Sequence, residues 1–186
     1  MIGVLVSGSG TNLQALLDAE LPVVAVASNV AGAYALERAE AAGVPHAVFE
    51  LDAFSSRDER DRAMASWLAE RGVELVVCAG YMQLLTAGFL ASFSRRVINV
   101  HPSLLPAFPG THAVTDALAA RAPETGVTVH EVDEGVDTGP ILAQESVPIL
   151  PGDTPETLLE RLHAVEHRLL PQIARQLLTE RLRSRQ

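Results

Sequence analysis

The chain has 186 residues, of which 48% are hydrophobic, and its formal net charge is -9 at pH 7. This length predicts one domain spanning residues 1–186, and the acidic balance argues against a nucleic-acid partner, because gripping a phosphate backbone needs a basic face. No apolar run is long enough to span a bilayer and no basic leader precedes the first strand-like segment, so we expect no membrane partner and a cytoplasmic location.

Short apolar runs alternate with longer segments of helical spacing, which predicts an α/β fold with a Rossmann-like, mostly parallel twisted sheet flanked by helices. The expected strands are Ile2–Val6, Val23–Ser28, Ala47–Glu50, Leu75–Ala79 and Val97–Val100. The expected helices between them are Asn12–Ala19, Ala33–Ala42, Arg57–Arg71 and Thr86–Phe93. Gly43 and Gly72 each follow a helix, where a left-handed C-cap is expected.

The pattern changes after Pro102. A helix from about His112 to Arg121 precedes two further strand-like runs, Gly126–Val132 and Ile141–Pro148. We expect an antiparallel C-terminal strand here, followed by a long C-terminal helix from Pro155 to about Arg183, which Asp153 and Thr154 would cap. Pro171 should kink this helix or mark a break in it.

The first predicted turn, residues 7–12, has the sequence Ser-Gly-Ser-Gly-Thr-Asn and leads from a strand into a helix. Its glycines let backbone N–H groups approach a phosphate, although a tight turn that uses glycine only for its geometry remains an alternative. Leu13 replaces the third glycine of a dinucleotide fingerprint, which argues against a nicotinamide enzyme. All 14 basic residues are arginines, so a Walker-type phosphate loop and lysine-dependent catalysis are excluded.

Cys78 is the only cysteine, so an internal disulfide and a multi-cysteine zinc site are excluded. Its place inside a strand-like apolar run favours packing over nucleophilic chemistry.

Asn99 and His101 stand two residues apart at the end of a predicted strand, so their side chains share one face. They are candidates for catalysis, although Asn99 as a turn cap and His101 as a hydrogen-bonded core residue are the alternatives. Asp133 and Asp137 lie in a glycine-rich loop, where acidic side chains often simply face water. If one of them lies beside His101, the pair could run acid–base chemistry near neutral pH.

Three segments together carry a resemblance that covers the chain from Ile2 to roughly Leu178. They are residues 8–14 (GSGTNLQ), residues 99–110 (NVHPSLLPAFPG) and residues 133–141 (DEGVDTGPI). In this order they resemble the folate-dependent formyltransferases, and specifically the phosphoribosylglycinamide formyltransferase branch. The resemblance implies transfer of a formyl group from 10-formyltetrahydrofolate to the amine of glycinamide ribonucleotide in purine biosynthesis, with no metal.

The resemblance also implies roles for individual residues. Asn99, His101 and Asp137 would be catalytic; the substrate-binding residues would be Gly10, Thr11, Asn12 and Glu166. The N-terminal half would bind the nucleotide, and the C-terminal half would bind folate and carry the catalytic residues. Folate would contact Arg57, Met82, Gln83, Leu84, Leu85, Asn99, Asp133, Glu134, Gly135, Val136 and Asp137.

For some of these expected binding residues, the sequence is equally consistent with a purely structural role. By residue type, Met82, Leu84 and Leu85 could be core residues, and Arg57 could be a solvated residue at the start of a helix. The helical spacing of the C-terminal segment does not distinguish Glu166 from other residues. We assign His112 no role beyond its loop. Two competing functions remain. One is another formyl-folate enzyme of the same fold, such as a hydrolase or a formyltransferase acting on initiator tRNA. The other is a non-catalytic nucleotide-binding module. Oligomeric state is left open between monomer and homodimer.

Overall fold

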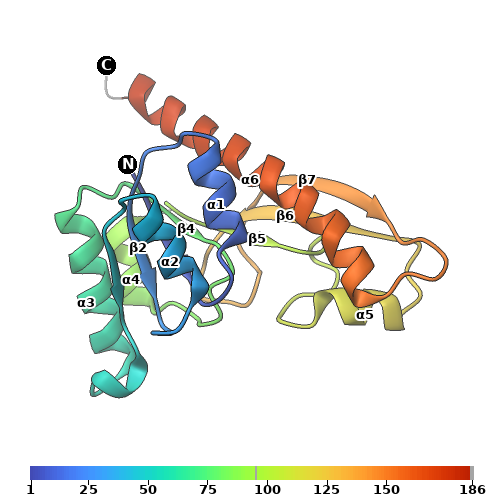
Figure 1. Ribbon diagram of the computed structural model, residues 1–186, viewed down its shortest axis with the longest axis horizontal. Coiled ribbons are helices and arrows are strands. Elements are labelled where there is room, and N and C mark those ends of the chain that lie inside the picture. Colours follow the sequence, from blue (N-terminus) through green and yellow to red (C-terminus); the bar gives the residue numbers. More distant parts are fainter. Residues whose placement is uncertain (95, 185–186) are drawn as a thin grey trace.

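A computed structural model describes residues 1–94 and 96–184 of the chain, so the predicted domain 1–186 reaches past the described part at residues 185 and 186 (Figure 1). The strands are β1 Ile2–Val6, β2 Val23–Ser28, β3 His46–Val48, β4 Leu75–Cys78, β5 Val97–His101, β6 Glu124–Glu131 and β7 Ile141–Pro148. The helices are α1 Thr11–Asp18, α2 Tyr34–Ala41, α3 Arg57–Glu70, α4 Ala87–Phe93, α5 Ala113–Ala119 and α6 Pro155–Ser184, with a 3-10 turn at Leu51–Ala53.

The strands form one sheet in the order β3-β2-β1-β4-β5-β6-β7. Strands β1 to β5 run parallel, β6 is antiparallel to β5, and β7 is antiparallel to β6. The predicted fold class is confirmed. All residues of β1 and β4 are buried, as expected of strands covered on both faces.

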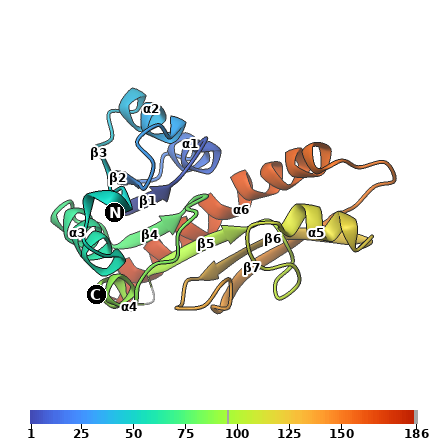
Figure 2. The ribbon, with the colours of Figure 1, turned by 90° about the horizontal axis from the view of Figure 1, so that it is seen from below.

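Helices cover both faces of the sheet (Figures 1 and 2). On one face α1, α2 and α6 contribute to a core that includes Leu13, Leu16, Leu158 and Leu162, and α5 packs against it. On the other face α3 and α4 contribute Met64, Leu68, Phe89 and Phe93. No helix in residues 1–94 or 96–184 combines the length and the apolarity needed to cross a membrane.

Most element boundaries agree with the sequence pattern, and two expectations need correction. Strand β3 spans His46–Val48 rather than Ala47–Glu50, because the chain turns away there and the Glu50 carboxylate accepts a hydrogen bond from Ala31 N (3.2 Å). Helix α6 continues through Pro171, so that residue does not mark a break; Leu170 and Ala174 of the same helix are buried in the core.

The smaller expectations hold. Gly43 and Gly72 both adopt positive φ, at 68° and 71°, as C-caps require. Thr154 Oγ1 accepts a hydrogen bond from Thr157 N (3.3 Å) at the start of α6. Cys78 is buried in β4, and burial raises the pKa of its thiol to about 12, so it packs as a neutral side chain.

Candidate active site

The strand order places a crevice between the carboxyl ends of β1 and β4. The chain leaves β1 toward β2 on one side and leaves β4 toward β5 on the other, so the two following loops diverge at a topological switch point. The loops are linked where they start, because Ser7 N donates to Gly80 O (3.1 Å) and Met82 N donates to Ser7 Oγ (2.8 Å). Ligands bind at such positions in open α/β sheets.

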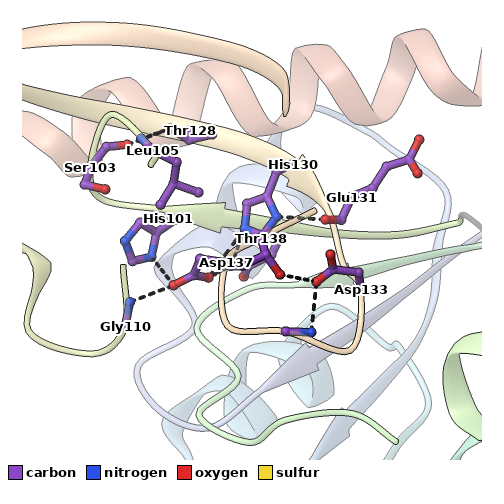
Figure 3. Close-up of polar contacts among 12 residues, drawn as sticks. His101, Ser103, Leu105, Gly110, Thr128, His130, Glu131, Asp133, Asp137 and Thr138 are labelled. Carbon is purple, nitrogen blue, oxygen red and sulfur yellow. Dashed lines mark hydrogen bonds and ion pairs between the residues drawn. The ribbon is translucent and has the colours of Figure 1, made fainter. Parts of the chain in front are cut away.

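The carboxylate of Asp137 is the centre of a polar cluster near the end of β5 (Figure 3). Oδ2 accepts a hydrogen bond from Gly110 N (2.8 Å) and lies 3.4 Å from His101 Nδ1. Oδ1 accepts a hydrogen bond from Asn99 Nδ2 (3.4 Å) and lies 3.5 Å from His130 Nε2. The structure therefore brings together all three residues expected to be catalytic, Asn99, His101 and Asp137, from β5 and the β6–β7 loop.

Both ring nitrogens of His101 face oxygen atoms that accept hydrogen bonds. Its Nε2 lies 2.9 Å from Phe108 O, and because a carbonyl only accepts, Nε2 must carry a proton. Its Nδ1 lies 3.4 Å from Asp137 Oδ2. Burial alone would raise the pKa of Asp137, but hydrogen bonds from His130 and Gly110 N and the positive charge of His101 hold that pKa below its usual value.

His130 is a member of this cluster that the sequence pattern did not reveal. It stands opposite Asn99 in the β5–β6 register, and its Nδ1 donates to Glu131 O (2.8 Å). Its Nε2 lies 3.2 Å from Asn99 Nδ2 and 3.5 Å from Asp137 Oδ1, so this ring nitrogen contacts both of the other groups. A histidine inside the apolar run of β6 was the available signal, but only the strand register connects it to Asn99.

Thr128, also on β6, anchors the loop that follows β5. Its hydroxyl donates to Ser103 O (2.6 Å) and accepts from Leu105 N (3.1 Å), and Gln144 Nε2 donates to it as well (2.9 Å). The Ser103 hydroxyl donates to Ala107 O (2.6 Å). Thr128 is fully buried, so these bonds are shielded from water and position the loop beside the Asp137 cluster.

A cavity of about 580 Å³, here called the nucleotide cavity, contains all four residues expected to bind the substrate: Gly10, Thr11, Asn12 and Glu166. Gly10 has φ 72°, and a Cβ there would lie 2.5 Å from Ala35 Cβ, so the turn requires glycine both for its conformation and for its packing on α2. The loop opens α1, whose first N–H groups have no partners within the helix.

Glu166 belongs to this cavity although it is distant in sequence. It is 4% exposed, and its carboxylate accepts a hydrogen bond from Asn12 Nδ2 (2.9 Å). Burial raises the pKa of Glu166, while the Asn12 bond and the nearby His163 act in the opposite direction. The alternative of a solvated helix residue is wrong for Glu166.

A smaller cavity of about 90 Å³ adjoins the Asp137 cluster. Most of the residues expected to contact folate line it, namely Gln83, Leu84, Leu85, Asn99, Asp133, Gly135, Val136 and Asp137. Met82 lines the nucleotide cavity instead, and Arg57 and Glu134 line a neighbouring surface depression of about 370 Å³. The expected folate set is thus spread over three adjoining hollows, with Leu85 shared between two of them.

Exposure decides between the competing interpretations of the 82–85 segment. Met82 is 61% and Leu84 48% exposed, so neither is a core residue, whereas Leu85 is buried. Arg57 is more than a solvated helix start, because its Nη2 donates to Leu84 O (2.8 Å). Thr86 N donates to the buried carboxylate of Asp61 (2.8 Å), so α3 holds this segment at two points.

No group of three or more histidine, cysteine, aspartate or glutamate side chains suited to a metal ion is found among the described residues.

Comparison with known proteins assigns a family to this arrangement. Residues 1–174 match the family model described as formyl transferase. The phosphoribosylglycinamide formyltransferase of Mycobacterium tuberculosis (strain H37Rv) is 50% identical over 171 residues, which cover 90% of this chain and 80% of that protein. The solved structure of glycinamide ribonucleotide transformylase 1 from Symbiobacterium toebii is 49% identical, with a TM-score of 0.90, over 92% of this chain and 84% of that one.

A longer relative is also similar. The trifunctional purine biosynthetic protein adenosine-3 of Drosophila pseudoobscura is 47% identical over 178 residues, which cover 91% of this chain but only 13% of that protein. The chain thus spans a small part of the length of the trifunctional relatives. Because the family model and these similarities cover most of the chain, it belongs to the formyl transferase family.

Proposed function

We propose that the chain transfers the formyl group of 10-formyltetrahydrofolate to the amine of glycinamide ribonucleotide, a step of purine biosynthesis. The single observation that carries this proposal is the convergence of Asn99, His101 and Asp137 beside the nucleotide cavity. Family membership and the names of the similar proteins support the same activity. The folate acts as a cosubstrate, and no metal takes part in the proposed reaction.

We infer a division of labour within one domain. Gly10, Thr11 and Asn12 would hold the phosphate of the nucleotide through backbone N–H groups and the Thr11 hydroxyl, and Glu166 would accept hydrogen bonds from the ribose. Folate would lie on the 82–85 segment and the 133–137 loop, where exposed apolar side chains adjoin backbone amides.

The proposed chemistry begins with attack of the substrate amine on the formyl carbon, which forms a C–N bond and places negative charge on the formyl oxygen. Protonated His101 and the Asn99 amide would stabilise that oxyanion. Both Asn99 N–H contacts in this structure are long, at 3.2 Å and 3.4 Å, so a stronger acceptor can displace one of them.

Collapse of the tetrahedral intermediate then breaks the bond from carbon to folate N10. The attacking nitrogen loses a proton and the departing N10 gains one, so the step balances without an external acid. Asp137 would keep His101 protonated and relay this proton through water, because its carboxylate is the shared partner of His101 and Asn99. Asp137 thereby couples charge stabilisation to proton transfer.

The test follows a labelled formyl group. Purified protein is incubated with formyl-labelled 10-formyltetrahydrofolate, with and without glycinamide ribonucleotide, and both products are separated. We expect the label to appear on the nucleotide, and we expect tetrahydrofolate to be released only when glycinamide ribonucleotide is present. Release of formate in the absence of the acceptor would instead identify a hydrolase. Binding of the nucleotide without turnover would identify a non-catalytic module. Either result overturns the proposal. His101→Ala should abolish transfer, whereas the exposed His46→Ala on β3 should not.

We further infer that the partners are these small molecules, that no nucleic acid or membrane is involved, and that the enzyme works in the cytoplasm. The acidic net charge of -9 supports the first part, because it disfavours a polyanionic partner. Whether the enzyme is a monomer or a homodimer is open, and sedimentation of the purified chain decides between these states.

A further inference from the structure

The nucleotide cavity has an unusual charge balance for a site that receives a phosphate. A phosphate monoester carries about -1.5 to -2 charges near pH 7. The carboxylates of Glu156 and Glu166 line the cavity. Lysine is absent from the chain, and among the residues that the structure describes no arginine lines this cavity. The only cavity-lining side chains that can become positive are therefore His112 and His163.

Arg38 is the guanidinium linked to the phosphate loop, but it does not line the cavity. Its Nε donates to Ser9 O (2.8 Å) and its Nη1 to Gln14 Oε1 (3.1 Å). The guanidinium also lies over the Tyr34 ring, 5.0 Å from its centroid. Arg38 lines a different groove, which shares Thr11 with the nucleotide cavity, and its bond to Ser9 O supports the backbone of the loop.

The two histidines reach the cavity from different elements. His163 lies on the first half of α6, and its Nε2 is 4.0 Å from Glu166 Oε2. His112 precedes α5, with Nδ1 3.2 Å from Thr111 Oγ1. Figures 1 and 2 show α5 beside the first half of α6. Both histidines line the nucleotide cavity. Each ring retains a partly exposed side that a ligand can approach.

The charged groups around each imidazole set its response to a ligand. His163 faces Glu166 and His167 on α6, while Glu156 at the helix start lines the same cavity. His112 has Asp116 in the first turn of its own helix. Burial, together with His163 and Arg38, keeps the pKa of His167 below its usual value despite Asp18, so His167 is protonated less readily than a free histidine.

We propose that His112 and His163 supply the positive charge of the nucleotide cavity, so that the anionic nucleotide binds with uptake of protons. This inference rests on the proposed nucleotide substrate. Histidine is the side chain that changes charge between about pH 5 and 8, so affinity for the nucleotide falls as pH rises through that range. A site that used lysine or arginine would keep its affinity for the nucleotide between about pH 5 and 8, because those side chains stay positive.

The test is calorimetric titration of glycinamide ribonucleotide into the full chain between pH 6 and pH 8, in buffers of different ionisation enthalpy, which yields the Kd and the protons taken up. We expect the wild-type Kd to rise about tenfold over this range, as loss of a charge-assisted contact implies. His163→Gln and His112→Gln should each reduce proton uptake. His46→Gln, a matched exposed histidine on β3, should behave as wild type.

A charge-retaining variant separates lost charge from lost packing. His163→Arg keeps a cation at this position at every pH in the range, so its Kd should be tighter than the wild-type Kd at pH 8, and only the smaller pH slope due to His112 should remain. The proposal is overturned if the two glutamine variants keep the pH slope and proton uptake of the wild type, or if His163→Arg binds with the wild-type pH slope. Absence of any nucleotide binding by the wild type at pH 6 would instead overturn the proposed substrate, which distinguishes the two failures.

Discussion

Replacement of Asp137 by asparagine tests the proton relay with little change in shape. The carboxylate accepts from Gly110 N and Asn99 Nδ2 and faces the rings of His101 and His130. An asparagine has one acceptor oxygen and one NH₂ group, so one side of the cluster loses its acceptor and meets a second donor. The negative charge that stabilises protonated His101 is lost in either orientation.

The magnitude follows from the geometry. At the 3.4 Å separation of His101 Nδ1 and Asp137 Oδ2, Coulomb attraction at an effective dielectric constant of about 20 amounts to about 5 kcal/mol before desolvation is subtracted. General acid–base groups contribute about 10²- to 10⁴-fold to rate. We therefore expect kcat for Asp137→Asn to fall by that factor, which corresponds to about 3–5 kcal/mol of transition-state stabilisation.

The assay is the initial rate of tetrahydrofolate formation, measured against each substrate in turn to separate kcat from KM. Asp52→Asn, in the exposed 3-10 turn, is the matched control and should retain wild-type rates. Circular dichroism confirms that both variants are folded. A kcat for Asp137→Asn that equals the wild-type value would refute the relay, because no other carboxylate in the described cluster contacts His101.

Three further predictions concern binding, stability and pH. Glu166→Gln should raise the nucleotide KM by about tenfold with kcat retained, as initial rates will show, because it removes the carboxylate that accepts from Asn12 and that we propose to bind the ribose. Gly10→Ala should cost about 1–3 kcal/mol in urea unfolding, whereas Gly8→Ala, with no atom within 4 Å of a new Cβ, should cost less. The pKa of Asp137 is lower in the folded chain than in the unfolded chain, where it is about 3.9. The Asp137 carboxylate therefore stabilises the fold above about pH 3.9, and this stabilisation is lost as pH falls through the folded pKa. In urea titrations, the difference in unfolding free energy between wild type and Asp137→Asn should become smaller in acid.

The fold was predictable where one physical signal dominated. Buried parallel strands need continuous apolar runs, so β1 and β2 were predicted with their exact ends. The β3 region lacks that signal, because its end depends on Glu50 reaching back to Ala31 and on a 3-10 turn. Pro171 was expected to kink the C-terminal helix or to mark a break in it, and the break does not occur, because α6 continues through this residue.

The site was predictable only in part. Alternation along β5 placed Asn99 and His101 on one face, but the approach of Asp137 depends on the path of the β6–β7 loop, which no local pattern encodes. His130 was missed because its role follows from the β5–β6 register. Met82 resembled a core residue by composition, and only its 61% exposure in the structure distinguishes it from a packed side chain.

The most direct test of the central claim is a crystal structure of the chain with glycinamide ribonucleotide and a folate analogue that cannot transfer its one-carbon group. We predict the phosphate at the 10–12 loop, and the substrate amine and the analogue's carbonyl group beside Asn99 and His101, with a donor within about 2.6–3.2 Å of the carbonyl oxygen. A complex in which the amine and the carbonyl group lie away from Asn99, His101 and Asp137 would contradict the account.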